Sequence, residues 1–112
     1  MKRILLAFLI AGFSFSAIAQ NVYNLIPVPK ELTPAQGSFT IKKGMATTIG
    51  DESFRAVAAM LASQCQTASG ISLPIKAGKS ATGIVFVMNS TLGEEAYALN
   101  VSSKKIELQA KT

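Results

Sequence analysis

Apolar residues change their spacing along the chain, and one stretch has the spacing of a helix. Between Ser53 and Ala68 they lie at the intervals of a single helical face. The residues on this face are Phe54, Val57, Ala58, Leu61, Cys65 and Ala68. Asp51 is placed to cap the N-terminus of this helix, and Gly70 is placed to end it in a left-handed conformation. The pattern therefore predicts a helix over residues 53–68.

Other segments have the patterns of strands. Residues 37–41 alternate polar and apolar, as in a half-buried strand, and a second short strand is expected over residues 46–49. Residues 84–88 are apolar throughout, which predicts a strand buried on both faces at the centre of the sheet. Alternation over residues 97–101 resumes over 106–110 after a short polar link, so these two segments are expected to form a hairpin.

Prolines mark segments that cannot lie inside a helix or a central strand. Pro27, Pro29 and Pro34 make residues 25–34 an extended lead-in. Pro74 restricts its short apolar segment to a sheet edge or a bend. The order of strands, helix and strands favours an α+β fold, with the helix packed on one face of an antiparallel or mixed sheet.

The first 19 residues have the three-part pattern of a signal peptide. Two basic residues precede an apolar stretch, and Ala17-Ile18-Ala19 predicts cleavage before Gln20. The stretch is shorter than the roughly 18 apolar residues that a membrane anchor needs. The only cysteine, Cys65, is too far from the cleavage point to carry a lipid. We expect an exported protein, periplasmic or extracellular, with residues 20–112 as one domain and no membrane association after cleavage.

Charge and composition exclude several functions. Without Lys2 and Arg3, nine basic residues remain against six acidic ones, a net charge of only +3. The lysines lie in predicted turns and strand ends, and the few aromatic residues have core positions, which excludes a nucleic-acid platform. One cysteine cannot form an internal disulfide, so a chain of this size depends on its core or on an additional covering surface.

Candidate catalytic groups are scarce. The chain has no histidine, which excludes Ser-His-Asp triads and histidine-containing zinc sites. The neighbours Asp51-Glu52 and Glu94-Glu95 do not converge on one face, and we interpret them as a helix cap and a solvated loop. Cys65 is expected to be a buried structural thiol. Gly78-Lys79-Ser80 resembles the end of a P-loop, but Leu73 stands where glycine is needed. We predict no catalytic, cofactor-binding or metal-binding residues in this segment.

Six segments of the mature chain form an ordered set. They are Leu25-Ile26-Pro27-Val28-Pro29, Gly37-Ser38-Phe39-Thr40-Ile41, the helix starting near Phe54, the strand Ile84–Met88, Glu95-Ala96-Tyr97-Ala98-Leu99-Asn100-Val101, and Lys105-Ile106-Glu107-Leu108-Gln109-Ala110. In order and spacing, this set resembles the N-terminal accessory domain of family-20 β-N-acetylhexosaminidases. The resemblance covers nearly all of residues 20–112.

The resemblance implies a sheet with helices on one side, packed against a following (β/α)₈ barrel that holds the active site. In that family, a barrel glutamate protonates the leaving oxygen and the adjacent aspartate orients the substrate's own acetamido group as nucleophile. No residue here matches that pair. The implied function is the non-catalytic, N-terminal portion of an exported enzyme that hydrolyses terminal N-acetylhexosamine from glycans. The segment is expected to stop before the last helix of its domain and before the barrel.

Two alternatives remain open at this point. Family-84 N-acetylglucosaminidases and family-67 α-glucuronidases place a similar accessory domain before a barrel, so the parent enzyme could cleave another glycoside. The chain could also be a free-standing periplasmic interaction module. None of these interpretations requires a cofactor.

Overall fold

The computed structural model describes residues 24, 25 and 27–111, and the chain divides into two units, residues 1–33 and 34–112. All helices and strands assigned in the described residues belong to the second unit. The predicted signal peptide, residues 1–19, lies outside the described residues. Within the part that is described, no helix has the length and apolar character needed to cross a membrane.

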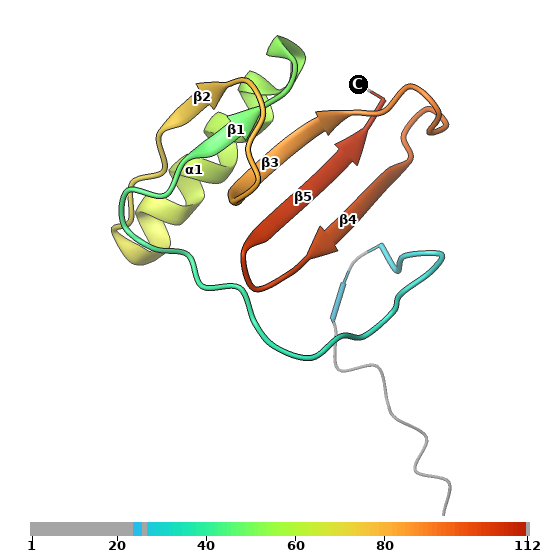
Figure 1. The fold of residues 1–112 in the computed structure, drawn as a ribbon, viewed down its shortest axis with the longest axis horizontal. Helices are drawn as coiled ribbons and strands as arrows, with labels where there is room; N and C mark the ends of the chain where they lie inside the picture. Colours follow the sequence, from blue (N-terminus) through green and yellow to red (C-terminus); the bar gives the residue numbers. More distant parts are fainter. Residues whose placement is uncertain (1–23, 26, 112) are drawn as a thin grey trace, which may run out of the picture. The chain divides into compact units, whose positions relative to one another are not determined.

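The second unit contains a sheet of five strands (Figure 1). The strands are β1 (Thr47–Ile49), β2 (Ile75–Ala77), β3 (Gly83–Met88), β4 (Tyr97–Val101) and β5 (Lys105–Ala110), in the spatial order β2-β1-β3-β5-β4. The strand β1 is parallel to both β2 and β3, and β3 is parallel to β5. Only β4 runs antiparallel to its neighbour, β5, as the hairpin pattern predicted.

We expected an antiparallel or a mixed sheet, and the sheet is mixed. Because most of its strand pairs are parallel, the fold is α/β and the prediction of an α+β fold is wrong. The difference comes from two connections. The helix α1 (Arg55–Ser69) links β1 to β2, so these three elements form a β-α-β unit with parallel strands. Residues 78–82 then cross β1 to start β3, again in the parallel direction. Hydrophobic alternation contains no information about either connection.

The prediction of a strand over residues 37–41 is wrong. This segment has no ladder partner in the sheet. Phe39 and Ile41 are nevertheless half-buried against the core, while Thr40 between them is exposed. The alternation of polar and apolar residues thus arises because Phe39 and Ile41 face the core. An extended segment can do this without the backbone hydrogen bonds of a strand.

The helix begins and ends where local residues direct it. A 3-10 turn, η1 (Glu52–Phe54), leads into α1, and the Asp51 carboxylate accepts a hydrogen bond from the Ser53 backbone N–H at 2.9 Å. At the other end Gly70 has φ 72°, and its N–H donates to the Gln66 carbonyl at 2.9 Å. Both predicted caps are confirmed.

The core lies between α1 and the strands β1, β2 and β3. Its buried apolar residues are Ile49, Phe54, Ala58, Leu73, Ile84 and Phe86. Phe54 at the start of the helix and Phe86 on β3 have ring centroids 5.7 Å apart, tilted by 36°. The strand over residues 84–88 is central, as predicted, with Ile84, Val85 and Phe86 buried. The segment that carries Pro74 forms the edge strand β2, also as predicted.

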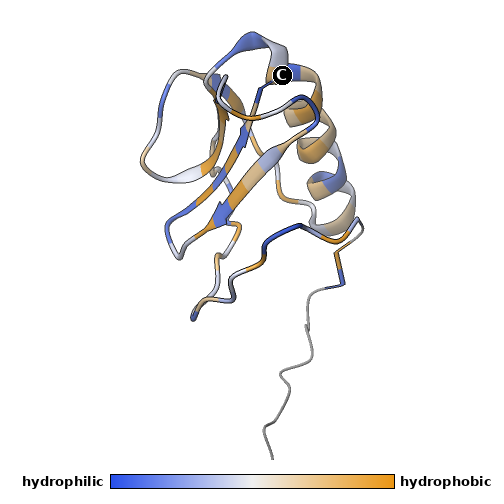
Figure 2. Ribbon diagram, turned by 90° about the vertical axis from the view of Figure 1, so that its right-hand side faces the viewer, coloured by the Kyte–Doolittle hydropathy of each residue, from blue (hydrophilic) through white to orange (hydrophobic). Residues whose placement is uncertain are grey.

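The helix buries a narrower stripe than its sequence suggested. Phe54 and Ala58 are buried, and Leu61 and Cys65 are partly buried against the core. Val57 and Ala68, both assigned to the apolar face, are exposed. Figure 2 shows apolar residues along both the helix and the strands of the sheet. The helix contacts β1 and β2, so one helix covers only part of the sheet.

Candidate functional site

The part of the sheet beyond the helix carries apolar side chains that are exposed on β4 and half-buried on β5, where they also pack against the core. Ladder partners point to the same face, and the register places Leu99 opposite Leu108, which is itself opposite Phe86 of the core. We define the apolar half-face as Tyr97, Leu99 and Val101 on β4 and Ile106, Leu108 and Ala110 on β5. Its β4 members are 50%, 53% and 47% exposed, in that order. This face is a continuation of the core without the helix that covers it elsewhere.

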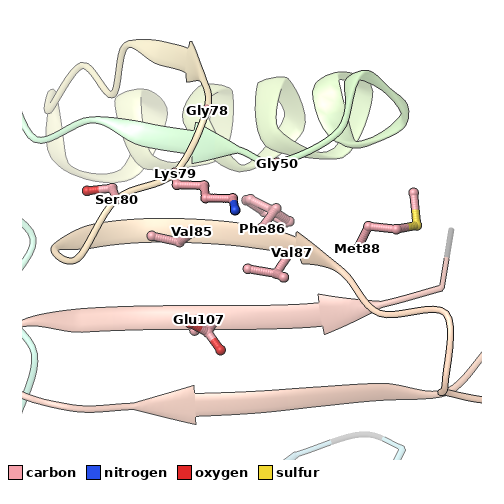
Figure 3. Close-up of a pocket in the computed structure, with 9 residues that line it drawn as sticks. All are labelled: Gly50, Gly78, Lys79, Ser80, Val85, Phe86, Val87, Met88 and Glu107. Atoms are coloured by element: carbon pink, nitrogen blue, oxygen red, sulfur yellow. The ribbon is translucent and has the colours of Figure 1, made fainter.

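The opposite face of the sheet contains a groove of about 410 Å³ (Figure 3). Residues 78–82 cross β1 on this side, since Lys79 and Ser80 line the groove together with Val85, Val87 and Glu107. The motif Gly78-Lys79-Ser80 is thus followed by the strand β3 and not by a helix, which confirms that it is no P-loop. The floor of the groove is aliphatic, with Lys79 and Glu107 as its charged side chains.

Glu107 lacks the electrostatic environment of a general acid. Its carboxylate accepts hydrogen bonds from the Lys105 ammonium and, at 2.7 Å, from the Gln109 side-chain amide. Both bonds favour the ionised form and lower the pKa of Glu107. A glycosidase acid requires a raised pKa, so that it holds a proton for the leaving group. Glu107 therefore acts as a bonded partner of its neighbours on β5.

The acidic pairs lie where they were expected. The pKa of Asp51 is lowered by its hydrogen bonds with Ser53 in the cap, and the pKa of Glu52 is lowered chiefly by its bond from Arg55. Glu94 and Glu95 are exposed in the turn before β4, with Glu94 Oε1 3.8 Å from the Lys111 ammonium. In the described part of the chain, these four carboxylates do not gather into one cluster. Asp51 and Glu52 lie at the start of the helix, and Glu94 and Glu95 lie in a solvated turn.

Cys65 differs slightly from its prediction. It is a free thiol, half-buried rather than buried, and its Sγ lies 3.6 Å from Ser69 Oγ. Cys65 lies in the last turns of α1, where the following residues 66–69 are exposed, so its side chain keeps some solvent contact. In the part of the chain that the structure describes, His, Cys, Asp and Glu residues form no cluster of three that could hold a metal ion.

The lysines are dispersed over different elements. Lys42 and Lys104 line a shallow groove of about 280 Å³, together with Phe39 and Met45, whereas Lys105 pairs with Glu107. The sequence did not indicate that Lys42 and Lys104 would line the same groove, because the loop before β1 and the β4–β5 turn are far apart in the chain.

Comparison with models of protein families identifies a match for nearly the whole chain after the predicted signal peptide. The chain matches the family described as "Glycosyl hydrolase family 20, domain 2" over residues 22–112. A search of the curated proteins finds no match.

Proposed function

The chain belongs to the family of glycosyl hydrolase family 20 domain 2, and from this membership we propose that it is the non-catalytic, N-terminal part of an exported β-N-acetylhexosaminidase. The parent enzyme hydrolyses terminal N-acetylhexosamine from glycans. Residues 1–19 direct its export and are removed before Gln20, and residues 20–112 support the catalytic domain. The match favours a family-20 parent over the family-84 and family-67 alternatives.

One observation carries the supporting role, the exposed apolar half-face. Leu99 and Leu108 continue the rows of the core on the same face of the sheet. The helix α1, however, makes its main contacts with β1 and β2, toward the edge opposite β4. A large contiguous apolar surface on a soluble protein marks a contact with another protein surface. Its proposed occupant is the remainder of the same enzyme, which includes the catalytic barrel. Val57 and Met60 on α1, 43% and 61% exposed, add to the apolar surface available for this contact.

The chemistry of the described residues supports a non-catalytic segment. Substrate-assisted cleavage in this family needs a carboxylic acid to protonate the leaving group and a carboxylate to orient the acetamido group. Glu107, which lines the larger groove, has a lowered pKa and two hydrogen-bond donors on its carboxylate. That arrangement binds the proton weakly, which is the opposite of what the acid must do.

The decisive experiment compares this chain with the full reading frame. The gene beyond Thr112 is read, and both products are assayed on a chromogenic N-acetylglucosaminide. The extended protein should encode an adjacent Asp-Glu pair and turn over the substrate, and the chain alone should be inactive. An inactive extended protein, or turnover that scales with the concentration of the purified chain, would refute the proposal. A reading frame that stops near Thr112 would instead identify a free-standing module.

The contact itself is tested by a matched pair of substitutions. Leu108→Lys changes the apolar half-face, and Gln109→Lys places the same charge on the opposite face of the same strand. If the half-face packs on the barrel, Leu108→Lys should lower the melting temperature of the extended protein more than that of the chain alone. Gln109→Lys should change both proteins equally. An equal effect of Leu108→Lys on both would contradict the contact.

Export has its own readout. Fractionation of expressing cells should place the protein outside the cytoplasm, with Gln20 as its first residue by N-terminal sequencing. Deletion of residues 2–19 should retain it in the cytoplasm. An uncleaved protein in the cytoplasmic fraction would remove the export part of the proposal and leave the family assignment intact.

A further inference from the structure

The outer edge of β4 presents backbone groups in a defined alternation. Ser102 donates its N–H to the Lys105 carbonyl at 2.8 Å, which makes these two residues a hydrogen-bonded pair of the hairpin. Hydrogen-bonded pairs alternate along an antiparallel ladder, so Asn100 and Ala98 also direct their N–H and C=O groups to β5. Tyr97, Leu99 and Val101 consequently direct theirs away from the sheet.

The other side of β5 supports this assignment independently. The carbonyl of Lys104 accepts from the Gly83 N–H at 3.0 Å, and the carbonyl of Ala110 accepts from the Asn89 N–H at 2.8 Å. Even-numbered positions near β5 thus face the β3 side, which leaves the odd-numbered positions to pair with β4. Among the described residues, β4 is at the end of the strand order and pairs with β5 alone.

Within residues 34–111, this edge lacks the features that usually prevent strand addition. Natural edge strands are protected by charged side chains, proline, bulges or a covering element. The strand Tyr97–Val101 contains no charged residue and no proline, and all five of its residues are exposed. It pairs with β5 residue by residue without a bulge.

We propose that β4 binds β4 of a second copy of this chain, antiparallel and centred on Leu99. In this register Leu99 pairs with the second copy's Leu99, and Tyr97 pairs with the second copy's Val101. Every backbone N–H and C=O that points outward from β4 then has a partner. The two-fold axis is perpendicular to the sheet, so the two apolar half-faces join on one side of a continuous ten-stranded sheet.

Side chains and charges fit the same register. Tyr97 beside a valine is an aromatic and β-branched cross-strand pair, which is a favourable combination. The acidic turn with Glu94 precedes β4, and Lys104 follows it. In an antiparallel pair, the acidic turn of each copy lies beside the basic turn of the other. A parallel arrangement would place like charges together.

The test uses sedimentation velocity of the purified chain over a concentration series. The unsubstituted chain should show a reversible monomer–dimer equilibrium. Leu99→Lys places two ammonium groups opposite each other and should weaken self-association by about tenfold or more. Ala98→Lys is the matched control. It adds the same charge to the same strand, but the proposed register places it opposite the second copy's Asn100 and not opposite another ammonium group, so it should weaken self-association less than Leu99→Lys.

A mixing experiment fixes the register. Because residue 99 faces itself across the axis, Leu99→Lys and Leu99→Glu chains should each be largely monomeric and should form a heterodimer when mixed. Circular dichroism of each variant checks that the fold is retained. A monomeric unsubstituted chain, a Leu99→Lys variant that still dimerises, or a mixture that stays monomeric would each overturn the proposal. These readouts are independent of glycosidase activity, so the outcome is separable from that of the proposed function.

Discussion

Thr47 gives the sharpest test of how this core is built. It lies at the start of β1 with no solvent exposure, on the face that packs under the helix. Its Oγ1 is the buried side-chain polar atom that has no hydrogen-bond partner among the described residues. Register places Thr47 beside Ile84 on β3 and Ile75 on β2, so its side chain has aliphatic neighbours in both adjacent strands. Thr47→Val replaces the hydroxyl by a methyl group at nearly constant shape.

The expected effect is an increase in stability. A buried hydroxyl without a partner loses its bonds to water on folding, at a cost of about 1–3 kcal/mol. Valine has no such group, adds apolar contact and has a higher preference for strands. We expect Thr47→Val to raise the free energy of unfolding by about 1–2 kcal/mol. For a domain of this size, that gain corresponds to a melting temperature about 4–16 °C higher.

Urea unfolding at one fixed protein concentration measures the difference. The midpoint should rise while the m-value stays the same, which separates a stability change from a change in the unfolded state. Thr48→Val is the matched control. Thr48 is the next residue of β1, points to the other face and retains 5% exposure. It should gain less than Thr47→Val. A lower or unchanged midpoint for Thr47→Val would show that the hydroxyl has a partner and that the reasoning is wrong.

Three further predictions address backbone strain, pH and the exposed face. Gly83→Ala should destabilise the fold by about 1–3 kcal/mol or more, since φ is 83° and a Cβ would lie 2.8 Å from the Ala46 carbonyl oxygen. Gly44→Ala, with φ 79° and open space, should cost less in the same urea titration. The lowered pKa of Glu107 stabilises the fold above the ordinary glutamate pKa, and this contribution disappears as pH falls through the folded-state value. Melting temperatures of Glu107→Gln should therefore fall less steeply at acidic pH than those of the unsubstituted chain, and equal slopes would contradict this. Finally, the chain alone should bind a hydrophobic dye through its apolar half-face, and Leu99→Lys should reduce the fluorescence; an unsubstituted chain that binds no dye would argue against an exposed face.

Elements defined by their own residues were predictable from the sequence. The helix was predicted because its apolar spacing, its Asp51 cap and its Gly70 end all act within a few residues of each other. The central position of β3 followed from five consecutive apolar residues, and the hairpin followed from two alternating runs around a short link. In each case, the physical cause and the sequence signal lie at the same place in the chain.

Features that depend on distant residues were not predictable. Parallel pairing of β1 with β3 is decided by how residues 78–82 return across the sheet, and no period in the sequence records that path. For the same reason the groove beneath Lys79 was missed, because it requires this loop to lie over Val85 and Val87. The sequence was sufficient to reject the motif around Lys79 as a P-loop, but it gave no sign that Lys79 would line a groove with an aliphatic floor.

The alternation in β4 and β5 contains more information than a hairpin alone requires. A hairpin needs backbone pairing, which any residues except proline could supply. Leu99 and Leu108, however, continue a core row beyond β1 and β2, the strands with which the helix makes its main contacts. If this face were exposed to solvent in the functional protein, polar residues at these positions would not lower the stability of the fold, and they would protect the free edge of β4. The apolar side chains on this face are therefore expected if another protein surface covers it. Edge pairing uses the backbone of β4, and face packing uses its side chains. A dimer through β4 is therefore tested with Leu99→Lys in the chain alone, where no barrel is present, and the barrel contact is tested with Leu108→Lys in the extended protein.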